Sequence, residues 1–163
     1  MESLYLVRHA IAAERGDEYP DDTKRPLTSQ GMARMRQVVK GLMTLDPRID
    51  LVLTSPLIRA RQTADILVAG LSPAPELAVE DTLAPDHRPE AVIDALGKHT
   101  SSEAVALVGH EPDLGILAAW LIGAREPLAF KKGGIARIDV GGKPGRDGQL
   151  IWLATPAMLR GLA

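Results

Sequence analysis

The chain has 163 residues, a length that predicts one domain, covering residues 1–163, with a sizeable buried core. Apolar residues make up 45% of the sequence and charged residues 25%, a balance that excludes a disordered chain. The formal net charge is −2, so no broad positive field exists to bind nucleic acid or an anionic membrane. Cysteine is absent, which excludes disulfides, thiolate metal sites and a cysteine nucleophile.

No apolar stretch reaches the roughly 18 residues that a membrane span requires. The longest candidate, Leu114 to Ile122, has the length of an ordinary helix. The N-terminus begins directly with a strand-like run and lacks the basic and long apolar segments of a signal peptide. We therefore expect a cytoplasmic protein without a membrane-spanning segment.

Short apolar runs alternate with helical patterns along the chain. The run "LYLV" is apolar at every position, as expected for a strand that is buried on both faces. Thr28 is an expected N-cap, Pro47 ends the helical region that follows it, and Gly70 suits the C-terminal stop of the next helix. In chain order the sequence predicts strand 4–7, a helical region between 28 and 47, strand 49–53, helix 57–69, a weak strand 77–81, helix 89–96, strand 104–108, helix 112–122 and a hairpin of strands 134–140 and 149–154.

Repeated strand–helix units imply crossover connections and a mostly parallel sheet with helices on both faces. The final hairpin, built around the turn-rich "GGKPGRDG", is expected to pair antiparallel at one edge of the sheet. The predicted fold class is α/β, a three-layer α/β/α sandwich.

Each of the three strongest strands is followed by polar residues at its carboxyl end. Arg8-His9 ends the first, Thr54-Ser55-Pro56 ends the second with Arg59 one helical turn further on, and Gly109-His110 ends the third. Ligands of open parallel sheets bind in the crevice beyond the carboxyl ends of the strands. If the three strands are neighbours, two histidines and two arginines meet in that crevice.

This set of side chains has the chemistry of a phosphoryl site. Guanidinium groups bind the non-bridging oxygens of a phosphoryl group through paired hydrogen bonds. A neutral imidazole is a nucleophile that forms a covalent intermediate, and a second imidazole can donate a hydrogen bond to the developing charge. Backbone N–H groups of the helices after Ser55 and Glu111 are expected to add to the anion site.

Simpler interpretations exist for each feature taken alone. A histidine after a strand is more often a hydrogen-bonded loop residue, and Arg59 alone is typical of a solvated helix position. A metal site at His9 and His110 competes, but two arginines would repel a cation. The "TSP" segment lacks the elbow of a nucleophilic serine, and "GGKPGRDG" lacks the ending of a phosphate-binding loop. The Lys131-Lys132 pair is interpreted as a solvated turn, and His87 and His99 belong to no constellation.

At these residues the sequence resembles the histidine phosphatase superfamily, also called the phosphoglycerate mutase-like family. "LVRHA" resembles its RHG signature, "LTSPLIRARQTADIL" its second arginine segment and "ALVGHEP" its second histidine segment. The short length, "RPLT" and "LAPD" point to the SixA-like branch of phosphohistidine phosphatases. The resemblance implies that His9 is the nucleophile and that Arg8, Arg59 and His110 hold the phosphoryl oxygens.

Two departures from the family pattern matter. Ala10 replaces the usual glycine, which requires that the turn after His9 avoid positive φ. Larger relatives also carry a carboxylate general acid, whose motif this sequence lacks. Glu80, Asp81, Asp86 and Asp22 are the candidates for it, and Asp22 and Arg25 are candidates for the rim of the site.

The missing acid favours phosphohistidine, because imidazole is an easier leaving group than an alkoxide. The expected activity is therefore metal-independent and cofactor-free hydrolysis of phosphohistidine on a partner protein, through a phosphorylated His9. Two alternatives stay open: a phosphatase of small phosphate esters, and a non-catalytic phosphate-binding module.

Overall fold

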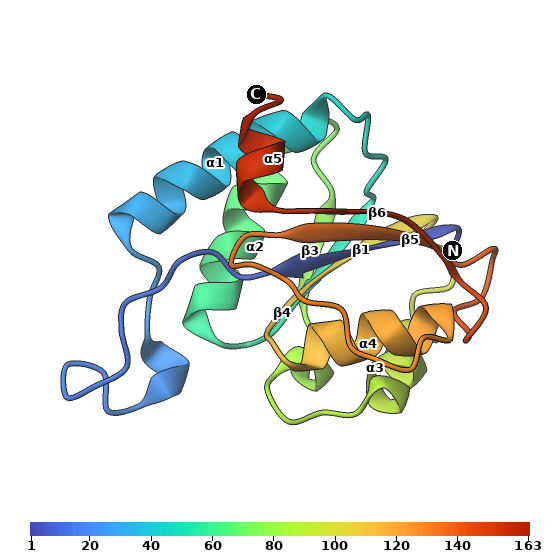
Figure 1. Cartoon of the computed structure of the whole chain (residues 1–163), viewed down its shortest axis with the longest axis horizontal. Coiled ribbons are helices and arrows are strands. Elements are labelled where there is room, and N and C mark those ends of the chain that lie inside the picture. Colours follow the sequence, from blue (N-terminus) through green and yellow to red (C-terminus); the bar gives the residue numbers. More distant parts are fainter.

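A computed structural model describes all 163 residues (Figure 1). The strands are β1 (Ser3–Arg8), β2 (Leu51–Thr54), β3 (Glu76–Val79), β4 (Ala104–Gly109), β5 (Ile135–Asp139) and β6 (Gln149–Ala154). The helices are α1 (Ser29–Met43), α2 (Ile58–Gly70), α3 (Pro89–Leu96), α4 (Asp113–Ile122) and α5 (Pro156–Arg160), with short 3-10 turns η1 (Asp22–Lys24) and η2 (Asp81–Leu83). None of the helices has the length and apolar character to span a membrane.

All six strands form one sheet in the order β3-β2-β4-β1-β5-β6. The first four in this order pair parallel, whereas β5 pairs antiparallel with β1 and with the edge strand β6. Helices α1, α2 and α5 cover one face of the sheet, and α3 and α4 cover the other (Figure 1). The predicted three-layer α/β class with an antiparallel edge is confirmed.

The central strands are apolar at every position because they contribute to two cores. In β1, Tyr5 and Val7 pack into the core beneath α1 and α2, while Leu4 and Leu6 pack into the core beneath α3 and α4. Successive side chains of a strand point to opposite faces, so a sheet covered on both sides needs an uninterrupted apolar run.

The helix boundaries follow from local chemistry. Thr28 is the N-cap of α1 as predicted, since its Oγ1 accepts a hydrogen bond from the N–H of Gly31 at 2.9 Å. Helix α1 ends at Met43, so Pro47 lies beyond its end rather than at it. Helix α5 was not predicted; Thr155 caps it by accepting the N–H of Met158, followed by Pro156 in its first turn.

Helix α2 ends at Gly70, as the sequence indicated, and this glycine also has a role in packing. It is the last residue of α2, and the capping residue Leu71 is extended rather than left-handed. A Cβ at position 70 would overlap the side chain of Val39 on α1. The glycine therefore permits the close approach of α1 and α2.

Gly70→Ala should lower the free energy of unfolding by about 1–3 kcal/mol, because the added methyl overpacks the contact with Val39. At an uncrowded helix position the same change would stabilise by about 1 kcal/mol. In a Val39→Ala background the methyl has room, so the loss should vanish there. Urea unfolding of the four proteins measures both effects, and an equal loss in both backgrounds would contradict the packing explanation.

Candidate active site

The polar residues that follow β1, β2 and β4 lie in one open cleft. Arg8 is in register with Gly109, and Thr54 with Val108, so the carboxyl ends of the three parallel strands are level with one another. The cleft has a volume of about 980 Å³, and its lining includes all four predicted site residues: Arg8, His9, Arg59 and His110. The structure thus brings together groups that are about 100 residues apart in the chain.

His9 lines this cleft, and the residue is almost completely buried. Its Nδ1 is 2.7 Å from the carbonyl oxygen of Ala10. A carbonyl only accepts hydrogen bonds, so Nδ1 carries the proton and Nε2 keeps its lone pair. Burial, together with the charges of Arg59 and Arg8, outweighs the hydrogen bond to Ala10 and lowers the pKa of His9 to about 4. The imidazole is therefore neutral and nucleophilic at physiological pH.

His110 faces His9, with the two ring centroids 5.2 Å apart. Its Nε2 lies 2.8 Å from Oγ of Ser55, and the same Oγ accepts the N–H of Leu57. The Ser55 hydroxyl has no other acceptor, so it donates to Nε2 and the ring proton resides on Nδ1. Burial and the neighbouring His9 and Arg59 lower the pKa of His110 to about 3, which keeps this ring neutral.

The two arginines are each anchored by part of the guanidinium group. Arg8 donates from Nη1 to the carbonyl of Phe130 at 2.7 Å. Arg59 donates to the carbonyl and to Oδ2 of Asp22, at 2.8 and 3.0 Å. Burial is the largest effect on both groups and lowers their pKa, and nearby carboxylates partly offset it. Both side chains are thus held in fixed orientations.

Four buried polar side-chain atoms in the whole chain have no hydrogen-bond partner, and three of them belong to this site: Nε of Arg8, Nε of Arg59 and Nδ1 of His110. Buried donors in folded proteins nearly always find an acceptor, so unpaired ones call for a functional explanation. A phosphoryl group carries three non-bridging oxygens and no donors, which is the chemistry that this set of donors matches.

Among the candidate rim residues, Asp22 and Arg25 both line the cleft. The Asp22 carboxylate accepts a hydrogen bond from Arg25 as well as the one from Arg59. Burial opposes ionisation of Asp22, but the hydrogen bond from Arg25 and the charge of Arg59 outweigh it and lower its pKa below the ordinary value. Asp22 is therefore an ionised anchor for the arginines and not a proton donor.

The other carboxylate candidates divide between the cleft and the surface outside it. Asp86 lines the cleft, and its backbone has a left-handed φ of 72°. Glu80 instead caps η2 by accepting the N–H of Thr82, and neither it nor Asp81 lines the cleft. No carboxylate other than Asp22 is held against the buried guanidinium groups by a hydrogen bond.

Three features of the cleft depend on the tertiary structure. Lys132, interpreted from sequence as part of a solvated turn, lines the cleft, because Gly133 donates to the carbonyls of Arg8 and His9 and ties that loop to β1. Ser55 was seen in the "TSP" segment, but its contact with His110 was not predicted. Ala10 has a negative φ, so it satisfies the condition set by the missing glycine, and its N–H donates to Oγ1 of Thr63.

Comparison with known proteins supports the phosphoryl-site chemistry of the cleft. The model of the histidine phosphatase superfamily (branch 1) matches residues 4–84. An uncharacterized protein of Picosynechococcus sp. is 38% identical over 96% of this chain and 98% of its own. The chain belongs to the histidine phosphatase superfamily.

Two further matches place this histidine phosphatase near one branch of the superfamily. The phosphohistidine phosphatase SixA of Escherichia coli K12 is 27% identical over 96% of each chain. The solved structure of the protein histidine phosphatase SixA complexed with tungstate is 28% identical, with a TM-score of 0.82 over 95% of this chain and 97% of that one. The predicted resemblance to the SixA-like branch is confirmed.

The depressed pKa of His9 has a measurable consequence for the pH dependence. The His9 ring in the folded protein should stay neutral until the pH falls to about 4, instead of protonating near the ordinary value of 6.5. The unfolded chain binds this proton at the higher pH, so the free energy of unfolding should decrease as the pH falls from 6.5 towards 4. Long-range 1H–15N NMR of the folded and the urea-unfolded protein measures both protonation midpoints. Coincident midpoints would contradict the burial argument.

Proposed function

We propose that this protein is a metal-independent phosphatase that hydrolyses phosphohistidine on a partner protein. The observation that carries the proposal is a neutral His9 with a free Nε2 in a cleft that also contains unpaired buried donors. The Asp22 carboxylate of this cleft is occupied by arginines. This combination suits a leaving group that needs no proton from the enzyme.

The reaction has two steps that balance without an added acid. In the first, Nε2 of His9 attacks phosphorus, and the P–N bond of the substrate breaks. The substrate imidazole leaves as a neutral ring, because it already carries a proton on its other nitrogen. In the second, water attacks phosphorus and the bond to Nε2 breaks. His9 leaves with its Nδ1 proton still held by Ala10, and the water protons remain with phosphate and solvent.

The other site residues stabilise the transferred group. Arg8 and Arg59 neutralise the charge of the phosphoryl oxygens and orient them for attack from His9. Nδ1–H of His110 donates to an oxygen on which charge develops. The two guanidinium groups supply positive charge that a metal ion would otherwise supply, which is why we propose metal independence.

Hydrolysis of a phosphate ester makes a different demand. An alkoxide leaving group needs a proton, and a positioned general acid contributes about 10²–10⁴ in rate. Asp22 is ionised and paired, and Asp86 lies at the cleft mouth. Small phosphate esters are therefore the second candidate substrates, with Asp86 as their proton donor. The open cleft also suits a histidine on a protein surface, and the expected cytoplasmic location stays a prediction.

A substrate panel in the presence of EDTA tests the proposal. The wild-type protein should hydrolyse a phosphohistidine peptide at least tenfold faster, by kcat/KM, than sugar phosphates or nucleotides. His9→Ala should abolish turnover and the acid-labile phosphoenzyme, because it removes the free Nε2 lone pair that attacks phosphorus. Preference for an ester would favour the second candidate. Peptide binding without turnover by either protein would favour a non-catalytic module.

Ser55→Ala should lower kcat about tenfold or more with a smaller change in KM, because His110 then loses the group that fixes its proton on Nδ1. The 15N shifts of the His110 ring should change from one tautomer to a mixture. Ser55→Thr keeps the hydroxyl and serves as the matched control. In a His110→Ala background, Ser55→Ala should have no further effect, and an undiminished loss there would contradict the positioning role.

A further inference from the structure

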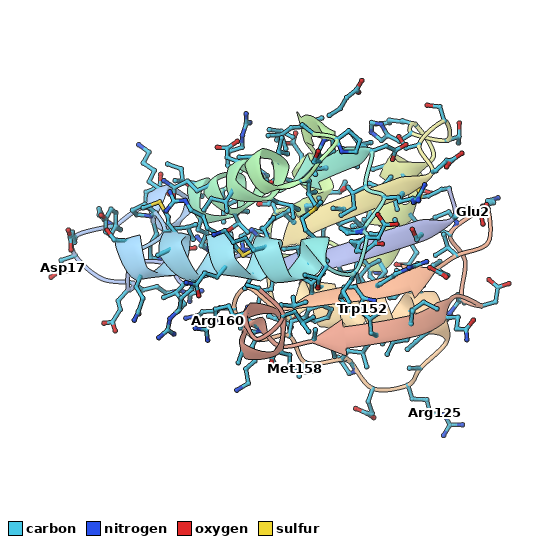
Figure 2. All side chains as sticks on the ribbon, turned by 90° about the horizontal axis from the view of Figure 1, so that it is seen from above. Glu2, Asp17, Arg125, Trp152, Met158 and Arg160 are labelled. Atoms are coloured by element: carbon cyan, nitrogen blue, oxygen red, sulfur yellow. The ribbon has the colours of Figure 1, made fainter.

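A second, smaller hollow lies beside the catalytic cleft. It is formed where the segment after β1, the first half of α1, the loop before β5 and helix α5 come together. Its volume is about 40 Å³, and the side chains of Met35 and Val38 are part of its wall. The rim carries three cationic side chains from three different segments: Arg34 of α1, Lys132 of the loop and Arg160 of α5. Figure 2 shows Arg160 beside α1.

The charges of this hollow are not compensated by the protein. No acidic residue lines it, and none of its three cations forms an ion pair. Side chains of these three residues make no hydrogen bond either, in contrast to Arg8, Arg25 and Arg59 of the cleft. The hollow is thus lined by positive charge alone, although the net charge of the chain is −2, and this lining favours an anion.

A second observation points in the same direction. Nε of Arg160 is the fourth of the buried polar atoms without a partner, and the other three mark the phosphoryl site. This buried unpaired donor belongs to a side chain that lines the hollow beside two other cationic side chains. A guanidinium group without a partner binds a negatively charged acceptor most strongly, so Arg160 also favours an anion as the ligand.

The size of the hollow limits what it can hold. A free volume of about 40 Å³ is room for roughly three water-sized groups, since one water needs about 10–15 Å³. A carboxylate fits these dimensions, whereas a nucleotide or a sugar phosphate is too large. The ligand class is therefore a small anion, of which a carboxylate group is one.

The position of the hollow indicates where the carboxylate comes from. Lys132 lines both the hollow and the catalytic cleft, and Ala10, next to the nucleophile His9, lines the hollow. A protein surface that presents a phosphohistidine to His9 will also cover this rim. We infer that the hollow binds an aspartate or glutamate side chain of the phosphoprotein substrate, an inference that rests on the function proposed above.

The test uses two synthetic phosphohistidine peptides that differ only in their flanking residues, which are Glu in one and Gln in the other. Inorganic phosphoramidate is the third substrate, and it reports on the cleft alone. The wild-type protein should prefer the Glu peptide by about three- to tenfold in kcat/KM, mostly through KM, and added salt should weaken this preference. Arg34→Glu should remove or invert the preference, because it replaces an exposed cation of the hollow by an anion.

Arg36→Glu is the matched control. It makes the same charge reversal on the exposed side of the same helix, two residues further on and outside the hollow. This variant should keep the preference for the Glu peptide, and all three proteins should hydrolyse phosphoramidate equally.

The possible results separate the two proposals. If no protein hydrolyses phosphoramidate or either peptide, the proposed function fails. If phosphoramidate is hydrolysed but Arg34→Glu and Arg36→Glu alter peptide preference alike, only the role of the hollow fails. A loss of phosphoramidate turnover in Arg34→Glu would also overturn it, because the hollow would then bind the reacting anion itself.

Discussion

The site depends on one constraint. Guanidinium and imidazole groups are buried at the carboxyl ends of parallel strands. His9, Arg59 and His110 are each at most 6% exposed. Burial disfavours the charged form of an imidazole, so both histidines are neutral, whereas a guanidinium group keeps its charge even when its pKa is lowered. The same environment thus suits a histidine to the proposed role of nucleophile and an arginine to the proposed role of anion clamp.

The protein offsets the cost of these buried cations with groups that stay in place when substrate binds. Asp22 compensates Arg59, and the carbonyl of Phe130 accepts from Arg8. The loop that supplies this carbonyl is held in turn by Glu111, whose carboxylate accepts N–H groups from Gly115 and Phe130. Such fixed partners leave other N–H donors of the arginines free, and this preorganisation favours the binding of a tetrahedral anion.

Carboxylates of the cleft illustrate how context decides the role of a residue type. Asp22 is an anchor because three arginines contact it, and Glu111 is an anchor because backbone N–H groups hold it. Neither is positioned to deliver a proton. This arrangement is the basis of the proposed phosphohistidine substrate, whose leaving group is already protonated. The cationic hollow beside the cleft is the proposed contact for the protein that carries it.

The sequence by itself determined the α/β class, the parallel strands and the residues at their carboxyl ends, since strand periodicity and strand-end position are local properties of the chain. Only the tertiary structure decided that Ser55 contacts His110, that Lys132 borders the cleft and that Gly70 accommodates Val39. It also showed that Asp22 binds arginines in the cleft whereas Glu80 caps η2 outside the cleft, a difference that the sequence does not reveal. These relations join segments distant in the chain, and hydrophobic patterning carries no information about which polar side chains meet across such distances.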